Sequence, residues 1–140
     1  MKFLLDTNVV SELSNPFPDP RVEHWLQTAD NEELGISCVT LAEVAQGISL
    51  LPEGRKRRDA QIWLDDVLQP WFDGRILMID AQISLLAGTV IGDSRRQGRT
   101  MSFADALIAA TCLSHDLTLV TRNIKDFSHR PDIRLFNPWA

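Results

Sequence analysis

The sequence has few cysteines, no long apolar run and no excess of positive charge. Its two cysteines, Cys38 and Cys112, stand in separate apolar segments and form no Cys-x-x-Cys pair, which excludes a disulfide scaffold and a cysteine-rich zinc site. The longest apolar runs are only a few residues long, far below the roughly 20 residues of a transmembrane helix. An acid follows only three apolar residues near the N-terminus, which is too early for a signal peptide. We therefore expect a cytoplasmic protein that does not contact membranes.

The net charge of −5 over 140 residues argues against a protein that coats DNA without sequence preference, because such proteins are basic. It does not exclude a nuclease whose carboxylates hold metal ions. The three histidines have no ligand spacing, and neither a P-loop nor a Gly-x-Ser-x-Gly motif is present. The composition, 44% hydrophobic and 24% charged, is that of one globular domain over residues 1–140.

Short apolar segments alternate with helical patterns along the whole chain. We expect strands at residues 2–6, 34–38, 75–79, 117–121 and 133–136. We expect helices at about 9–15, from 20 after the cap Asp19, at 40–51, from 53 to a break or kink at Pro70, at 80–97 and at 103–113. This alternation predicts an α/β fold in which a parallel sheet of four to five short strands is sandwiched between helices.

Polar side chains gather where the predicted strands end or where the adjacent helices begin. These positions are Asp6, Glu43, Asp105, Asn123 and Asp126. In a parallel sheet the carboxyl ends of the strands meet at one edge, where ligands bind. Each acid also has a structural explanation, because Thr40–Glu43 and Ser102–Asp105 match the capping-box spacing, Asp6 can cap a helix and Asp126 can start a turn.

Several carboxylates at one sheet edge need a counter-charge, because each buried ion costs several kcal/mol of folding free energy when it is unpaired. Oxygen ligands of this kind suit Mg²⁺ or Mn²⁺, which keep several waters and are held directly by only one or two carboxylates. Such a site supports the attack of an activated water on a phosphodiester. An aspartate at a strand end also marks phosphoacceptor proteins, but no second aspartate stands two residues after Asp6.

Four segments in order resemble the motifs of PIN-domain ribonucleases, and more narrowly VapC toxins of the FitB-like branch. They are Leu4-Leu5-Asp6-Thr7-Asn8, Thr40-Leu41-Ala42-Glu43-Val44, Phe103-Ala104-Asp105-Ala106 and Thr121-Arg122-Asn123-Ile124-Lys125-Asp126-Phe127. The resemblance implies a Mg²⁺- or Mn²⁺-dependent endoribonuclease, the toxin of a toxin–antitoxin pair. It also implies a homodimer, neutralisation by a cognate antitoxin, and contact with operator DNA only through that antitoxin.

By the same resemblance, Asp6, Glu43 and Asp105 hold metal, Thr7 and Asn8 orient Asp6, and Thr121 lines the site. Many relatives have aspartate where this chain has Asn123, so either Asn123 or the catalytic candidate Asp126 completes the site. For the RNA backbone we favour Arg95, Arg96, Arg99 and Arg122 over residues 55–58, which we interpret as a solvated helix face.

Two questions stay open from the sequence. The apolar stripe from Trp63 to Phe72 indicates core packing or, alternatively, a partner surface. The chain could also be a PIN-like binding module without activity, an alternative that the neutral Asn123 favours and the retained Asp6, Glu43 and Asp105 oppose.

Overall fold

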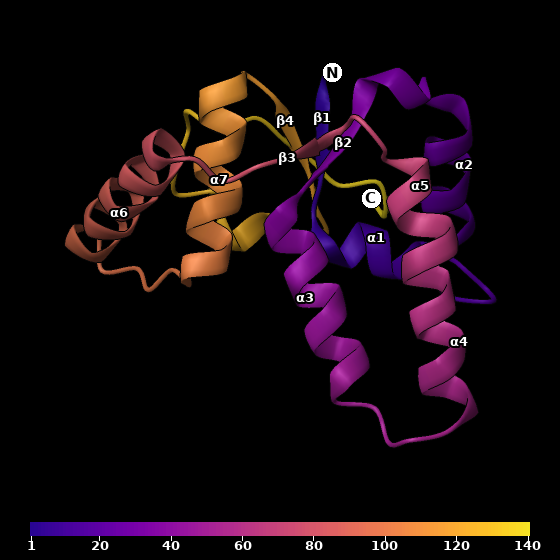
Figure 1. Ribbon diagram of the computed structural model, residues 1–140. Helices are drawn as coiled ribbons and strands as arrows, with labels where there is room; N and C mark the ends of the chain where they lie inside the picture. The colour runs from indigo at the N-terminus through magenta and orange to yellow at the C-terminus, as the bar shows by residue number, and fades with distance from the viewer.

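A computed structural model describes all 140 residues and contains one parallel sheet of five short strands. The strands are β1 (Phe3–Leu5), β2 (Leu34–Ser37), β3 (Ile76–Leu77), β4 (Thr118–Val120) and β5 (Leu135–Phe136). They are ordered β3-β2-β1-β4-β5, and every neighbouring pair is parallel. Helices cover both faces (Figure 1). The predicted α/β sandwich is therefore confirmed.

The two central strands build two separate cores, because successive side chains of a strand point to opposite faces. Leu4 and Leu119 are buried against helices α6 (Ala81–Arg96) and α7 (Phe103–His115). Their neighbours Leu5 and Val120 are buried in the other core. The register of β1 on β4 pairs Leu4 with Leu119 and Leu5 with Val120. Each pair therefore points to the same face of the sheet and belongs to the same core.

The second core is covered by the remaining α-helices. These are α1 (Thr7–Leu13), α2 (Pro20–Thr28), α3 (Cys38–Ser49), α4 (Arg55–Trp63) and α5 (Gln69–Trp71). Two 3₁₀ turns complete the chain, η1 (Asn31–Glu33) and η3 (Ile124–Asp126). Helices α3 and α4 form an antiparallel pair that extends past the carboxyl ends of the strands (Figure 1).

The helix that carries the apolar stripe continues through a π-helical segment, η2 (Leu64–Leu68), into α5. The wider turn, in which the Gln69 N–H is directed to the Leu64 carbonyl, lies directly before Pro70, a residue that cannot donate a backbone hydrogen bond. The helix then ends at Trp71, close to the predicted break. Leu64, Leu68 and Phe72 are buried, so this part of the stripe packs in the core. Trp63 and Trp71 are only partly buried and Val67 is half exposed, so the rest of the stripe lies at the surface.

Several predicted boundaries were wrong by a few residues. Ser37, not Thr40, is the N-cap of α3, because its side chain accepts the Val39 N–H at 3.0 Å. Thr40 is buried inside the helix, so the proposed capping box with Glu43 does not exist. The next helix begins at Arg55 rather than at residue 53. Gly54 has a φ of 150°, which is not a helical conformation, so the helix can start only after it. All five strands are shorter than expected, and β3 has only two residues.

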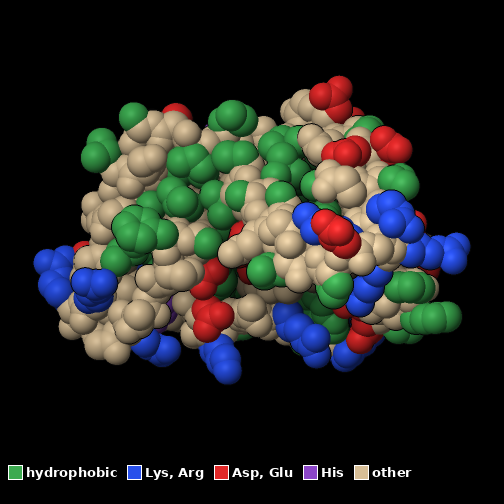
Figure 2. Space-filling view, turned by 60° about the horizontal axis from the view of Figure 1, so that its bottom comes forward, with side chains coloured by type: hydrophobic (Ala, Val, Ile, Leu, Met, Phe, Trp, Pro, Cys, Tyr) green, Lys and Arg blue, Asp and Glu red, His purple; other side chains and the backbone are tan.

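None of the helices is long and apolar enough to cross a membrane. Some large apolar side chains nevertheless lie at the surface, among them Met78, Leu85 and Phe103, each more than 70% exposed. They belong to the part of the chain around α6 and α7, where apolar side chains gather on the left of the surface view (Figure 2).

Candidate active site

A fully polar pocket of ≈ 460 Å³ lies at the carboxyl ends of the central strands. No apolar residue lines it; its walls are Asp6, Thr7, Asn8, Ser11, Glu12, Glu43, Asp105 and Asn123. Acidic side chains gather in the middle of this face of the molecule (Figure 2). The strand order reverses between β1 and β4, and such switch points are where open α/β sheets bind ligands.

Asp6 lies at the bottom of the pocket, directly after β1, with only 6% of its surface exposed. Its Oδ1 accepts the Thr7 N–H at 2.8 Å, so the residue also caps α1 as the structural explanation predicted. Its Oδ2 accepts the Thr121 hydroxyl at 2.8 Å and the Asn8 amide at 3.3 Å. Burial raises the pKa of Asp6, while the hydrogen bonds from Thr121 and Thr7 favour the charged form.

Glu43 is held beside Asp6 by the first turn of α1. The Thr7 hydroxyl donates to Glu43 Oε1 at 2.6 Å and also lies 3.3 Å from the Thr40 hydroxyl. Helix α3 therefore carries Glu43 into the pocket, although not from its first turn. Thr7 thus contacts both acids, Asp6 through its backbone and Glu43 through its side chain.

The end of β4 supplies the second group of hydrogen bonds. The Thr121 hydroxyl, which is buried, accepts the Asn123 N–H at 3.0 Å and lies 3.3 Å from Asn8 Nδ2. The side-chain Oδ1 of Asn8 accepts the Arg122 backbone N–H at 3.2 Å. The structure therefore brings Thr7, Asn8, Thr121 and Asn123 together around Asp6, the arrangement that the resemblance implied.

Asp105 enters the pocket from the first turn of α7. Ser102 caps this helix by accepting the Asp105 N–H at 3.1 Å, so the predicted cap is present. The pKa of Asp105 is raised to about 6, chiefly by burial and also by the negative charges of Asp6, Asp126 and Glu43, while the hydrogen bond from Ser102 lowers it. The Asp105 carboxylate is thus placed where negative charge is already concentrated.

No basic side chain balances these acids. The ion pairs of the molecule join Asp19, Asp93, Asp116 and Asp132 to arginines, and none includes an acid of the pocket. Oxygen donors without a counter-charge match the chemistry of Mg²⁺ or Mn²⁺. No three acids, histidines or cysteines are arranged to hold one ion together. The residues therefore fit an ion held directly by one or two carboxylates, with water completing its shell.

The remaining predicted residues lie outside the pocket. Asp126 is exposed on η3 and does not line it, whereas Asn123 does. Arg122 packs over the Trp139 ring at 5.3 Å, and Arg96 forms an ion pair with Asp93 at the end of α6. Arg95 and Arg99 are exposed near the same helix end and line none of the described pockets.

Two residues of the pocket wall, Ser11 and Glu12, escaped the sequence analysis. Both lie on the later part of α1, one turn beyond Asn8, so the helical repeat returns them to the same side. Glu12 Oε1 also accepts the Asp19 N–H at 2.7 Å, which ties α1 to the start of α2. The spacing from Asn8 to Glu12 is the signal that could have indicated this acid.

The raised pKa of Asp105 predicts a stability change that can be measured without metal. Folded Asp105 holds its proton up to a pH of about 6, above its ordinary 3.8, so the free energy of unfolding falls as pH rises between those values and stays lower above them. In EDTA at pH 8, Asp105→Asn should therefore unfold at higher urea concentration, by on the order of 1 kcal/mol after allowance for solvent screening. The gain should vanish at pH 4. The exposed control Asp73→Asn should show no such pH-dependent gain, and an Asp105→Asn variant no more stable than the wild type at pH 8 would contradict the prediction.

Comparisons with known proteins show the family of the chain and other structures with the same fold. Residues 3–132 match the family model of the PIN domain. The chain is 37% identical to Toxin FitB of Neisseria gonorrhoeae over 97% of both chains, and 32% identical to VapC ribonuclease Y4jK of Sinorhizobium fredii over 97% and 96%. The solved structure of FitAB bound to an IR36 DNA fragment covers 99% of this chain and 96% of its own, with a TM-score of 0.90 and 35% identity. The chain therefore belongs to the PIN-domain family.

Proposed function

We propose that this chain is a Mg²⁺- or Mn²⁺-dependent endoribonuclease that acts as the toxin of a toxin–antitoxin pair. The observation that carries the proposal is the meeting of Asp6, Glu43 and Asp105 in one polar pocket without any basic partner. The names of its relatives, a Toxin FitB and several VapC ribonucleases, support the same activity. Carboxylates in this arrangement are suited to metal-assisted hydrolysis of a phosphodiester.

Asp6 and Asp105 are the residues that would hold the ion directly, with Glu43 and either Asn123 or Asp126 acting through water. When bound, a divalent ion lowers the pKa of a water molecule and stabilises the oxygen that leaves the phosphorus. Below a pH of about 6 Asp105 holds a proton, which metal binding would have to displace.

Hydrogen bonds from neighbouring polar residues hold the side chains of Asp6 and Glu43 in place. Thr121 and Asn8 both donate to Oδ2 of Asp6, while Oδ1 accepts only the Thr7 N–H and keeps a lone pair for an ion. Thr7 holds one oxygen of Glu43 and leaves the other free. Partners of this kind keep ligands in place, and their loss reduces metal affinity or activity by about 10–100-fold in metal sites generally.

The activity is tested by cleavage of a structured RNA in Mg²⁺, Mn²⁺ or EDTA. Cleavage should require the metal and should fall by at least about 10²-fold in Asp6→Asn, because the variant keeps the size of the side chain but loses its charge. Thr121→Val should lose about 10–100-fold. The control Asp73→Asn changes the same charge at an exposed position outside the pocket and should cleave like the wild type.

The alternative, a binding module without activity, predicts a different result from the same assay. In that case the wild type would not cleave in any metal, and calorimetry would detect no Mn²⁺ binding that Asp6→Asn abolishes. Unchanged cleavage in Asp6→Asn would contradict the assignment of the site.

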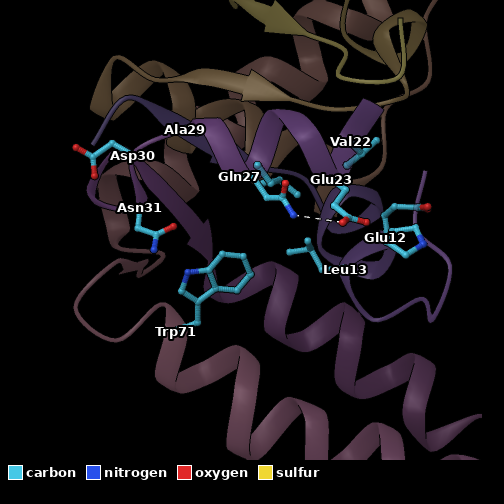
Figure 3. Close-up of a pocket in the computed structure, with 11 residues that line it drawn as sticks. Glu12, Leu13, Val22, Glu23, Gln27, Ala29, Asp30, Asn31 and Trp71 are labelled. Carbon is cyan, nitrogen blue, oxygen red and sulfur yellow. Dashed lines mark hydrogen bonds between the residues drawn. The ribbon is translucent and has the colours of Figure 1, made fainter. Parts of the chain in front are cut away.

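A groove of ≈ 600 Å³ next to the site supports the antitoxin as partner. Leu13, Val22, Leu26 and Trp71 are apolar residues of its lining, which also includes the acids Glu12, Glu23 and Asp30. Trp71 and Leu13 lie across the groove from the helix that carries Glu23 and Gln27 (Figure 3). Glu12 lines both this groove and the acidic pocket. An antitoxin segment with apolar and basic side chains would match the groove. The same segment would reach the acidic pocket past Glu12.

This proposal predicts that a charge change in the groove weakens the complex with the antitoxin encoded beside the gene. Glu23→Lys should lower the affinity on the order of tenfold at low salt, because the lysine repels the basic side chains, and the effect should shrink as salt is added. Surface plasmon resonance measures both. The exposed Glu32→Lys, outside the groove, is the matched control. Equal affinities for the two variants would contradict this partner surface.

We also propose that the chain forms a homodimer through the exposed apolar side chains near α6 and α7, including Leu85 and Phe103. A monomer rarely leaves a large contiguous apolar patch in water. Light scattering on a sizing column should therefore give twice the 15.8 kDa of the chain, and Leu85→Glu should shift the protein to the monomer. The exposed Gln82→Glu is the control on the same helix. A monomeric wild type would contradict the dimer.

A further inference from the structure

A line of connected hollows leads away from the acidic pocket between α1, α3 and α4. The first hollow, of ≈ 190 Å³, shares Ser11 and Glu43 with the pocket. The next, of ≈ 620 Å³, shares Ser14, Leu51 and Trp63 with the first. We call this continuous depression, from Glu43 to the start of α4, the side groove. Along α3 its lining runs from Glu43 to Ile48, a rise of about 7.5 Å at 1.5 Å per residue.

The far end of the side groove is basic. Arg55 and Lys56 line it, and Arg57 and Arg58 follow on the same helix around a neighbouring hollow. None of these four side chains forms an ion pair, whereas Arg21, Arg96, Arg130 and Arg134 all do. Only Asp59 contributes a negative charge to this end of the groove. A chain of net charge −5 thus keeps its densest group of cations without acidic partners.

The start of α4 adds to the positive potential. Its N-cap is Gly54, which has no side chain to accept the first N–H groups of the helix. Unsatisfied N–H groups at a helix N-terminus carry a partial positive charge. Arg55 and Lys56 stand on these first residues, so charged side chains and backbone dipoles favour an anion at the same place.

Trp63 provides the apolar part of the side groove. It lies two turns after Arg55 on α4 and lines both hollows, and its side chain is only partly buried. An indole face next to cations is the combination that binds single-stranded nucleic acid, because bases stack on the ring while the cations hold the phosphates.

We propose that the side groove binds the single strand of the RNA substrate on one side of the scissile phosphate, with Arg55 and Lys56 on the backbone and Trp63 under a base. This inference rests on the proposed ribonuclease function, since it takes RNA as the ligand of the adjoining acidic pocket. It replaces the solvated face that the sequence indicated for residues 55–58. An RNA strand matches all three parts of the path, since its phosphates suit both the basic end and a metal at the acids, and its bases suit the indole.

The test measures RNA binding and cleavage separately in the full-length protein. The probe is a fluorescein-labelled, unstructured RNA of about 20 nucleotides, longer than the about 4–16 nucleotides of typical single-strand sites. Binding by anisotropy is measured in EDTA, so it does not depend on catalysis. Arg55→Gln with Lys56→Gln should weaken binding about tenfold and should reduce the slope of log K against log salt by about 1.4, because two phosphate contacts are lost at about 0.7 each.

Trp63→Leu keeps an apolar side chain in the core and removes the stacking face. It should weaken binding about tenfold while leaving the salt slope unchanged, because no charge is lost. In the cleavage assay all three substitutions should raise KM and leave kcat nearly unchanged, since they act away from the reacting phosphate. Circular dichroism and the melting temperature confirm that each variant is folded.

The matched control is Lys2→Gln with Arg134→Gln. It removes the same two charges at the amino ends of β1 and β5, on the opposite edge of the sheet from the acids. Its RNA affinity and salt slope should equal those of the wild type.

The outcomes separate this inference from the proposed function. If the wild type cleaves RNA but the Arg55/Lys56 and Trp63 variants bind and cleave like the control, the side groove is not the RNA path and the nuclease assignment stands. If the wild type binds RNA without cleaving it, and the variants weaken that binding, the groove stands and the activity does not. If the variants lose affinity only for the antitoxin, the groove is a protein-binding surface, and the inference is overturned.

Discussion

The hydrogen bond from Thr121 to Asp6 is the contact on which the rest of the site depends. It joins the ends of β1 and β4, residues 115 positions apart, and it forms only because the register places Leu5 beside Val120. That register is set by the two cores, since a shift of one residue would turn Leu4 and Leu5 toward the wrong faces. Apolar packing at the centre of the sheet therefore determines where the buried carboxylate is held.

The same arrangement is unfavourable for the fold itself. Asp6 and Asp105 both have raised pKa values, because burial and neighbouring carboxylates disfavour their charged forms and no arginine or lysine compensates. A protein selected for stability alone would place apolar or paired residues there. Buried carboxylates without counter-charges, in a fold whose other parts are mutually consistent, indicate a ligand site rather than part of the scaffold.

The sequence was sufficient for the features that local chemistry decides. Asp19 with Pro20, Asp80 and Ser102 begin their helices as predicted, because each cap bonds backbone groups only a few residues away. The convergence of Asp6, Glu43 and Asp105 followed from the parallel sheet. The cap at Thr40 was wrong because Ser37 competes for the same helix start and lies one turn earlier. The groove under α2 and the side groove were not predictable, since they depend on how α1 packs against α2, α3 and α4.

The distribution of charge links these surfaces. The net charge of −5 conceals a separation in which unpaired acids occupy the carboxyl ends of the strands and unpaired cations occupy the start of α4. Within each group, repulsion between like charges destabilises the folded protein when no ligand is bound. A single polyanion that lies along the side groove, with a divalent cation at the acids, neutralises both groups at once. An acidic protein can in this way bind an acidic polymer, because the local fields rather than the total charge determine where it binds.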